Sequence, residues 1–190
     1  MEACAGAHYW GREMNKLGHT AKLIAPAYVK PFVKRQKNDV ADAEAICEAA
    51  QRPTMRFVAV KSEEAQASAM VLRTRDLLVR QPTQAINALR GHLAEFGVIV
   101  AKGLAHVAKL IALLDDPASD LPEAVRAILS VLVEQLSALD RRIAALDRDI
   151  ARRAKEDTVA RRLMTIPGIG AVTAVALVSL APPAESFRCE

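Results

Sequence analysis

Residues 132–150, LVEQLSALDRRIAALDRDI, decide the fold class of this chain. Large aliphatic residues recur along this stretch in steps of four, three, four, three and four; they are Leu132, Leu136, Leu139, Ile143, Leu146 and Ile150. This spacing predicts a long helix with one apolar seam, the a/d pattern of helices that pack lengthwise. The partner is either a second helix of the same chain, in an antiparallel hairpin, or a second copy in a dimeric coiled coil. The spacing leaves both open.

The composition favours helices built around small aliphatic side chains. Hydrophobic residues make up 52% of the 190 residues, whereas aromatic residues make up only 4%. Ala and Leu are strong helix formers, so this balance predicts a mainly α protein. A chain of this length forms either one domain with an appendage or two small lobes.

The charge pattern is compatible with nucleic acid as a partner. The formal net charge is +4. Basic residues gather in two stretches; they are Lys30, Lys34, Arg35 and Lys37, and then Arg141, Arg142, Arg148, Arg152, Arg153, Lys155, Arg161 and Arg162. Such clusters suit a phosphate backbone, but the solvated faces of helices carry the same residues, so charge alone decides nothing.

Cysteine usage and hydropathy exclude several other classes. Cys4, Cys47 and Cys189 form no CxxC pair and are odd in number. This argues against a disulfide framework and against a zinc site, and it favours the cytoplasm as the compartment. No signal peptide is visible, and no apolar run approaches the roughly 20 residues that span a bilayer, so no membrane partner is expected.

Short α/β elements are predicted ahead of the long helices. We expect helices at 3–17, 39–51, 63–96 and 102–114, and strands at 20–25 and 55–60. In the first helix alanine, Tyr9, Trp10 and Met14 occupy the apolar side. A strand that follows a helix and a Gly turn is half of an α/β unit, and its parallel partner strand should lie upstream of residue 1.

Three residues mark helix starts or defects. Asn38 and Ser62 are expected to cap the helices that follow them, because their side chains accept hydrogen bonds from the free amides of a first turn. Pro82 falls inside the long helix 63–96, where proline costs about 3 kcal/mol. We therefore predict a bend or break near Arg80.

Two aspartates are the first candidate for chemistry. Asp39 and Asp42 are three residues apart, so they share one face of the predicted helix. Paired carboxylates are hard oxygen donors for Mg²⁺, which two-metal sites use in phosphodiester chemistry. The plainer interpretation is that Asp39 stabilises a helix N-terminus and Asp42 is solvated. Glu2 has the same two interpretations. The basic run at Lys34, Arg35 and Lys37 shifts the balance toward phosphate binding.

Residues 166–170, IPGIG, form the second candidate. Two glycines between helices allow a tight turn and a close backbone approach, and the free amides of the next helix suit a phosphate. Helix-hairpin-helix modules bind the DNA backbone in this way, without recognising bases. An ordinary interhelical turn is the alternative. We expect Pro167, Gly168, Ile169 and Gly170 to contact DNA.

Together these motifs resemble the insertion-sequence one-ten family of bacterial transposases. The stretches that carry the resemblance are residues 1–10 (MEACAGAHYW), 37–43 (KNDVADA), 84–97 (QAINALRGHLAEFG) and 164–170 (MTIPGIG). They occur in the family's order and extend over nearly the whole chain. Each motif is weak alone, but their joint occurrence is specific.

The resemblance implies a three-part organisation. Residues 1–61 would be part of an α/β RNase H-like (RuvC-like) domain, residues 62–155 a helical coiled-coil region, and residues 156–190 the start of a transposase domain with a helix-hairpin-helix. It also implies that Glu2, Asp39 and Asp42 belong to a DEDD tetrad that binds Mg²⁺. The implied partners are the DNA ends of an insertion element, a guide RNA in some relatives, and a second copy of the chain.

The resemblance further implies an incomplete catalytic machinery. The family's first Asp would lie on a strand upstream of Met1, and its nucleophilic Ser would lie beyond Glu190. We therefore expect a transposase fragment that binds DNA but is inactive alone. The alternatives are a non-enzymatic DNA-binding or dimerising helical protein and a purely structural one.

Overall fold

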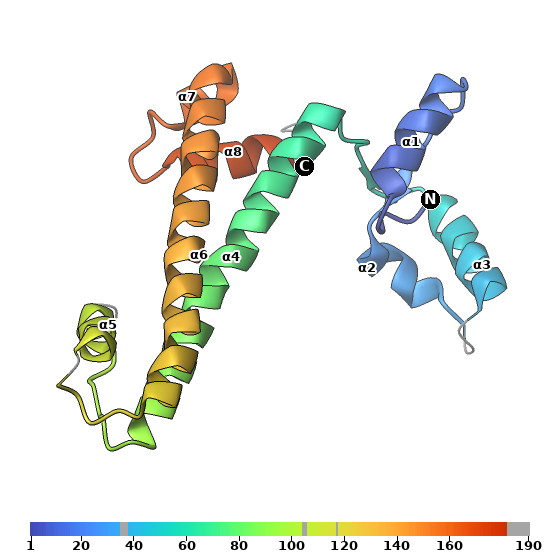
Figure 1. The fold of residues 1–190 in the computed structure, drawn as a ribbon. Coiled ribbons are helices and arrows are strands. Elements are labelled where there is room, and N and C mark those ends of the chain that lie inside the picture. The colour runs from blue at the N-terminus through green and yellow to red at the C-terminus, as the bar shows by residue number, and fades with distance from the viewer. Residues whose placement is uncertain (35–37, 104–105, 117, 182–190) are drawn as a thin grey trace. The chain divides into compact units, whose positions relative to one another are not determined.

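The structure, a computed structural model, describes residues 1–34, 38–103, 106–116 and 118–181 (Figure 1). It divides into two compact units, one formed by Met1–Ala67 together with residues 179–181, the other by Ser68–Val178. Both are mainly helical, which confirms the fold class expected from the composition. None of the helices in the described ranges has the length and apolar character needed to cross a bilayer.

The first unit combines short helices with a minimal sheet. Its elements are α1 (Ala7–Lys16), β1 (Leu23–Ile24), α2 (Pro26–Val29), the 3₁₀ turn η1 (Lys30–Phe32), α3 (Asp39–Ala50) and β2 (Phe57–Val58). The two strands pair antiparallel, with Leu23 opposite Val58 and Ile24 opposite Phe57. The core of this unit consists of Ile24, Val29, Ala45 and Ala49, so α2 and α3 close over one side of β1.

The parallel partner of β1 lies inside the chain, which corrects the expectation that it lies upstream of residue 1. Glu2 forms a parallel bridge with Ile24. The amide of Ala3 donates to the carbonyl of Ile24 at 2.7 Å, and the amide of Ile24 donates to the carbonyl of Met1 at 2.9 Å. Residues 1–3 thus lie beside β1 through one isolated parallel bridge, with α1 between them in the chain.

The buried face of α1 is not the one that the sequence pattern suggested. Tyr9, Trp10 and Met14 are exposed, and the two rings meet edge to face at 5.3 Å. The buried positions are Ala7 and Gly11. A Cβ added at Gly11 would lie 2.9 Å from Cγ2 of Val60. The helix thus packs through its smallest residues, because a close backbone approach leaves no room for the rings.

Both predicted caps are confirmed. The Asn38 side chain accepts a hydrogen bond from the amide of Ala41 at 2.8 Å, and Ser62 Oγ accepts from the amide of Ala65 at 3.1 Å. Each cap satisfies one of the amides that a helix leaves without an intrahelical partner. Helices α3 and α4 therefore start where the sequence predicts.

The second unit is an antiparallel pair of long helices with shorter helices packed on it. Helix α4 (Glu63–Ala94) enters this unit at Ser68; the others are α5 (Val107–Asp115), α6 (Glu123–Glu156), α7 (Thr158–Leu163) and α8 (Ala171–Leu180). Figure 1 shows α4 and α6 running in opposite directions beside one another. The seam predicted along residues 132–150 therefore packs within the chain.

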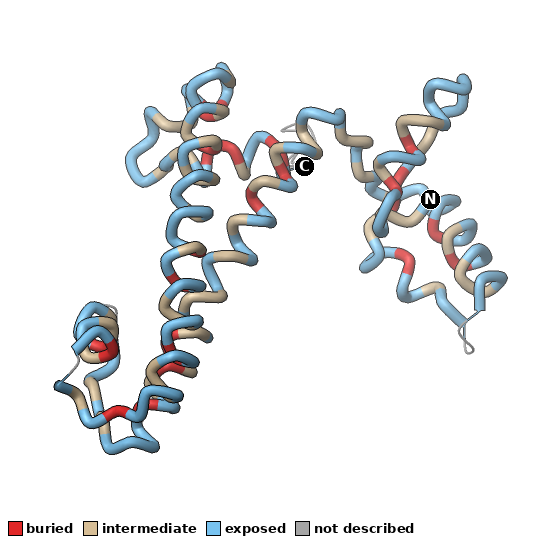
Figure 2. Tube along the Cα trace, in the orientation of Figure 1, coloured by how far each residue is buried: buried red, intermediate tan, exposed pale blue. Residues whose placement is uncertain are grey.

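Two apolar clusters hold the second unit together (Figure 2). One joins α4, α5 and α6 and consists of Leu89, Leu93, Leu110, Leu114, Leu121 and Leu129. The other joins α4, α6, α7 and α8 and consists of Leu72, Ile150, Ala154, Ala160, Ala174 and Val175. Polar contacts reinforce the α4–α6 pair: Arg75 forms an ion pair with Asp147, and Arg153 donates to Ser68 Oγ at 3.1 Å.

Helix α4 passes through Pro82 without interruption, which excludes a break near Arg80, while the alternative of a bend stays a prediction. Proline removes one backbone hydrogen bond and clashes with the preceding turn. Packing on both sides of the proline opposes that cost, because Leu72 belongs to one apolar cluster and Leu89 to the other. Tertiary burial here outweighs local propensity.

Two isoleucines of α6 provide a matched test of the hairpin. Ile150 is fully buried, whereas Ile128 is 67% exposed. We predict that Ile150→Ala lowers the free energy of unfolding by about 2–5 kcal/mol, because it leaves a cavity between helices. Ile128→Ala should change it by less than about 0.5 kcal/mol. Urea denaturation followed by circular dichroism measures both, and equal losses would contradict the assigned seam.

Candidate nucleic-acid interface and acidic residues

The segment between α7 and α8 is a tight turn with an exposed tip. The amide of Ile169 donates to the carbonyl of Ile166 at 3.1 Å, and Gly168 has φ 88°. Pro167 in the second position and a positive-φ glycine in the third define a type II β-turn. Pro167, Gly168 and Gly170 are exposed. The sequence IPGIG therefore forms the tight turn that its residues predict.

This turn stands on a buried base. Ala160 of α7 and Ala174 of α8 are both fully buried, in the same cluster as Ile150 and Ala154 of α6. Ile169 packs against this cluster. Of the four turn residues expected to contact DNA, Ile169 therefore packs into the apolar cluster and holds the turn in place. The other three form its accessible surface.

The N-terminus of α8 lies directly after the turn. Its first intrahelical hydrogen bond runs from the amide of Ala174 to the carbonyl of Gly170, at 2.9 Å. The amides that precede Ala174 in the first turn have no carbonyl one turn back to bind. Such amides carry partial positive charge and suit an anionic oxygen.

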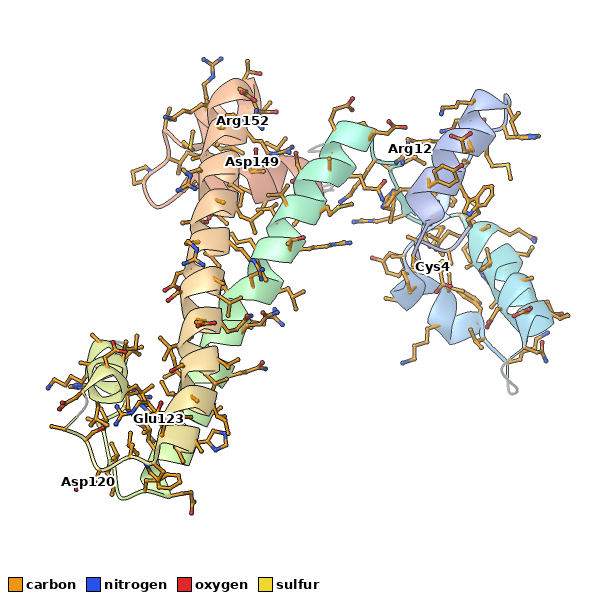
Figure 3. The ribbon with its side chains drawn as sticks, in the orientation of Figure 1. Cys4, Arg12, Asp120, Glu123, Asp149 and Arg152 are labelled. Atoms are coloured by element: carbon orange, nitrogen blue, oxygen red, sulfur yellow. The ribbon has the colours of Figure 1, made fainter. Side chains whose placement is uncertain are left out.

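The basic residues near the turn differ in what they bind. Arg152 pairs with Asp149 at 2.6 Å and with Glu156 at 2.7 Å, and Arg153 pairs with Asp149 at 2.8 Å (Figure 3). Hydrogen bonds from Arg153 and Arg152 hold the pKa of the Asp149 carboxyl below its ordinary value. Asp149 therefore stays ionised at neutral pH, and it occupies both arginines.

Arg161 and Arg162 are the exposed cations that immediately precede the turn in the chain. They occupy the last turn of α7, one helical turn before the hairpin tip, and both are exposed. Among the residues that the structure describes, neither has an ion-pair partner. In the sequence they belong to a stretch with six other basic residues. Their position just ahead of IPGIG is the signal that separates them.

The candidate acidic residues lie in the first unit. Asp39 and Asp42 occupy the first turn of α3, where Asp39 is exposed and Asp42 is half-buried. Glu2 lies at the bridge to β1. Within the described ranges, no three His, Cys, Asp or Glu side chains are grouped closely enough to hold a metal ion. The structure therefore does not gather Glu2, Asp39 and Asp42 into one ligand set.

The basic run ahead of α3 is only partly described. Lys34 pairs with Glu44 at 3.1 Å, and both side chains are well exposed. An exposed pair of this kind contributes roughly 0–1 kcal/mol, so Lys34 can exchange its partner for a phosphate at little cost. Arg35 and Lys37 lie outside the described residues.

Comparison with known proteins connects the chain with one class of enzyme. Residues 6–98 match the model of the IS110-type DEDD family, which is described as transposase. The protein named "Probable family 20 transposase" of Pseudomonas aeruginosa is 45% identical over 99% of the chain and 56% of its own length. The transposase for insertion sequence element IS1328 of Yersinia enterocolitica is 41% identical over 94% of the chain and 53% of its own length.

A third relative is similar over the same extent. The transposase for insertion sequence element IS1111A of Coxiella burnetii is 38% identical over 99% of the chain and 52% of its own length. The chain thus spans about half the length of the curated relatives that it matches. No solved structure matches it.

The two glycines of the turn differ in a way that stability measurements detect. Gly168 has φ 88°, whereas Gly170 has no positive φ, and a Cβ at either position meets nothing within 4 Å. We predict that Gly168→Ala lowers the free energy of unfolding by about 1–2 kcal/mol, through backbone strain alone. Gly170→Ala should change the free energy of unfolding by less than about 0.5 kcal/mol. Chemical denaturation distinguishes them, and an unchanged Gly168 variant would exclude the type II turn.

Proposed function

The chain belongs to the IS110-type family of DEDD transposases, and from that membership we propose that it binds DNA and takes part in transposition of a bacterial insertion sequence. The observation that carries the proposal is 38–45% identity to four transposases over nearly the whole chain. A non-enzymatic DNA-binding or dimerising protein is less favoured, because all four relatives are named transposases. The compartment that goes with this function is the bacterial cytoplasm.

The proposed DNA contact is the turn at Pro167, Gly168 and Gly170, acting as a helix-hairpin-helix. Its exposed tip, the free amides at the start of α8 and the cations Arg161 and Arg162 are all found within a short stretch of chain. Backbone amides and guanidinium groups bind phosphate oxygens without recognising bases. The contact would therefore fix the position of a duplex rather than select its sequence.

The first unit supports an RNase H-like (RuvC-like) origin. Residues 1–3 form one parallel bridge with β1, with α1 between them in the chain, and strand–helix–strand order of this kind is typical of such α/β domains. Helix α3 then carries Asp39 and Asp42 close to its N-terminus. The catalytic part of the proposal rests on these two carboxylates and Glu2.

A divalent metal fits these residues only in part. Asp39 and Asp42 share one face of α3, and Mg²⁺ is commonly bound by one or two carboxylates together with substrate phosphates. Glu2 does not complete a group of three with them among the described residues. We therefore propose that Asp39 and Asp42 hold Mg²⁺ together with DNA phosphate oxygens, and we derive no catalytic step through the ion.

Two further partners belong to the proposal. A guide RNA is inferred from family membership alone. Leu136, Leu139 and Ile150 of the α6 seam are already buried within the chain, so a homodimer through α6 would use a surface outside these residues. Ile128 and Val131 offer such a surface, since they are 67% and 63% exposed on α6. Sedimentation equilibrium decides between monomer and dimer.

The salt dependence of DNA binding tests the proposed contact at the turn between α7 and α8. We predict that the double variant Arg161→Gln/Arg162→Gln binds duplex DNA more weakly and has a smaller slope of log affinity against log salt, by about two, because two phosphate contacts are lost. Arg152→Gln is the control, since Asp149 and Glu156 already neutralise Arg152. Fluorescence anisotropy at several salt concentrations measures the slopes. An unchanged slope in the double variant would exclude these cations as phosphate contacts.

The response of DNA binding to Mg²⁺ tests the carboxylates. We predict that Mg²⁺ tightens DNA binding by the unsubstituted chain, and that Asp39→Asn/Asp42→Asn removes this response because the ion loses its protein ligands. Glu63→Gln/Glu64→Gln is the matched control, because these residues are also an acidic pair in the first turn of a helix. Anisotropy titrations with and without Mg²⁺ provide the measurement. A response that survives in the aspartate variant would place the ion elsewhere.

A further inference from the structure

The first unit contains a cavity that the proposed DNA contacts do not use. It is broadly open to solvent, has a volume of about 810 Å³ and lies between the α2–η1 turn and the segment that follows α3. Tyr28, Phe32, Arg52 and Arg56 are among its lining residues. Cavities that hold small organic groups are typically about 300–1,000 Å³, so the volume suits a nucleotide.

One wall of this cavity is a supported guanidinium group. Arg52 Cζ lies 5.1 Å from the centre of the Phe32 ring, and Arg52 also forms an ion pair with Glu48. Phe32 in turn packs against the core cluster of Ile24 and Ala49. The guanidinium group is thus held by the ring and by a carboxylate while it lines the cavity. Arginine planes held in this way serve as stacking surfaces for bases.

A second wall is an aromatic ring that remains accessible. Tyr28 is 49% exposed, although it lines the cavity. Aromatic rings offer a π-face to any base, and stacking on such rings adds to the affinity for unpaired strands. Tyr28 and the Phe32–Arg52 pair therefore provide two stacking surfaces around one cavity.

The charge of the cavity matches a phosphodiester. Of the described residues that line it, Arg52 and Arg56 are charged and none is acidic. Glu48 neutralises Arg52 from outside the lining, which leaves Arg56 as the cation for a phosphate. Aromatic surfaces combined with a free arginine are the chemistry of a single-stranded nucleic-acid site, not of a duplex site.

We propose that this cavity holds an unpaired nucleotide of a DNA strand, with its base against Tyr28 and Arg52 and its phosphate at Arg56. The inference rests on the proposed DNA-binding function and adds to it a site for single strands. Bases within a duplex stack on one another, so their faces are not available for stacking on side chains. A site of this kind therefore acts only where the duplex is opened or a base is extruded.

The test compares two tyrosines that are equally exposed. Tyr28 is 49% and Tyr9 is 50% exposed, and Tyr9 lies on α1, outside the cavity lining. The probe is a fluorescein-labelled oligothymidylate of about 12 nucleotides. We expect Tyr28→Ala to raise its Kd at least about fivefold, and Tyr28→Phe to preserve binding because the ring remains. Tyr9→Ala should leave the Kd unchanged.

The charge contribution has its own measurement. Arg56→Gln should weaken binding of the same oligonucleotide and reduce the slope of log affinity against log salt by about 0.7, the value for one single-strand phosphate. Circular dichroism spectra of all variants identify any that fail to fold, and Tyr28→Phe keeps the test valid if Tyr28→Ala does fail. A Kd for Tyr28→Phe as poor as that of a ring-less variant would overturn the stacking role.

Binding of duplex DNA, measured in parallel, separates this inference from the proposed function. Loss of single-strand binding in Tyr28→Ala with unchanged duplex binding supports the cavity site. Equal single-strand Kd values for Tyr28→Ala, Tyr9→Ala and the unsubstituted chain overturn it, while retained duplex binding keeps the proposed function intact. An effect of Tyr28→Ala on oligouridylate without one on oligothymidylate overturns the assignment to DNA. Failure to bind either form of DNA overturns both proposals.

Discussion

The contact on which the second unit depends is the burial of Ile150 and Ala154 of α6 against Leu72 of α4. Both α6 residues are completely removed from solvent. Burial of an isoleucine side chain contributes about 1.5–3 kcal/mol, and here the same residues also support α7 and α8. One apolar cluster therefore closes the helical hairpin and fixes the base of the IPGIG turn. The shape of the candidate DNA contact therefore depends on the packing of α4 against α6.

This dependence explains how a short turn becomes a usable binding surface. A loop that must be ordered on binding loses conformational entropy at that moment, which lowers its affinity. The turn between α7 and α8 instead has a buried alanine on each flanking helix and a half-buried Ile169 beneath it. Its amides are therefore oriented before any ligand arrives. Asp157, which caps α7 through the amide of Ala160 at 2.7 Å, adds to the same order.

Features that depend on residues close together in the sequence could be predicted, whereas features that depend on contacts between distant residues could not. The seam of α6, the Asn38 cap and the IPGIG turn depend on residues a few positions apart, and the structure has all three. The buried face of α1 was predicted wrongly, and the sequence left open whether α4 bends or breaks at Pro82. They depend on Val60 packing against Gly11 and on two apolar clusters on either side of Pro82, which are contacts between distant residues.

The candidate site shows the same division. The position of the turn was predictable from the sequence. It was not predictable that, among the described residues, Arg152 forms ion pairs and Arg162 does not, because ion pairing depends on which carboxylates lie within reach. The cavity beside Tyr28 was missed entirely. Its residues come from two segments about 20 positions apart, and no local pattern connects them. The grouping of Glu2 with Asp39 and Asp42 stays a prediction from the family resemblance.

The exposed aromatic pair on α1 has an optical consequence. Trp10 is the chain's single tryptophan, and both tyrosines, Tyr9 and Tyr28, also belong to the first unit. Tryptophan and tyrosine fluorescence therefore originates from that unit, and with Trp10 55% exposed its emission is that of an indole in contact with water. The far-ultraviolet ellipticity comes mainly from the long helices α4 and α6. The two signals monitor different halves of the molecule without any added label.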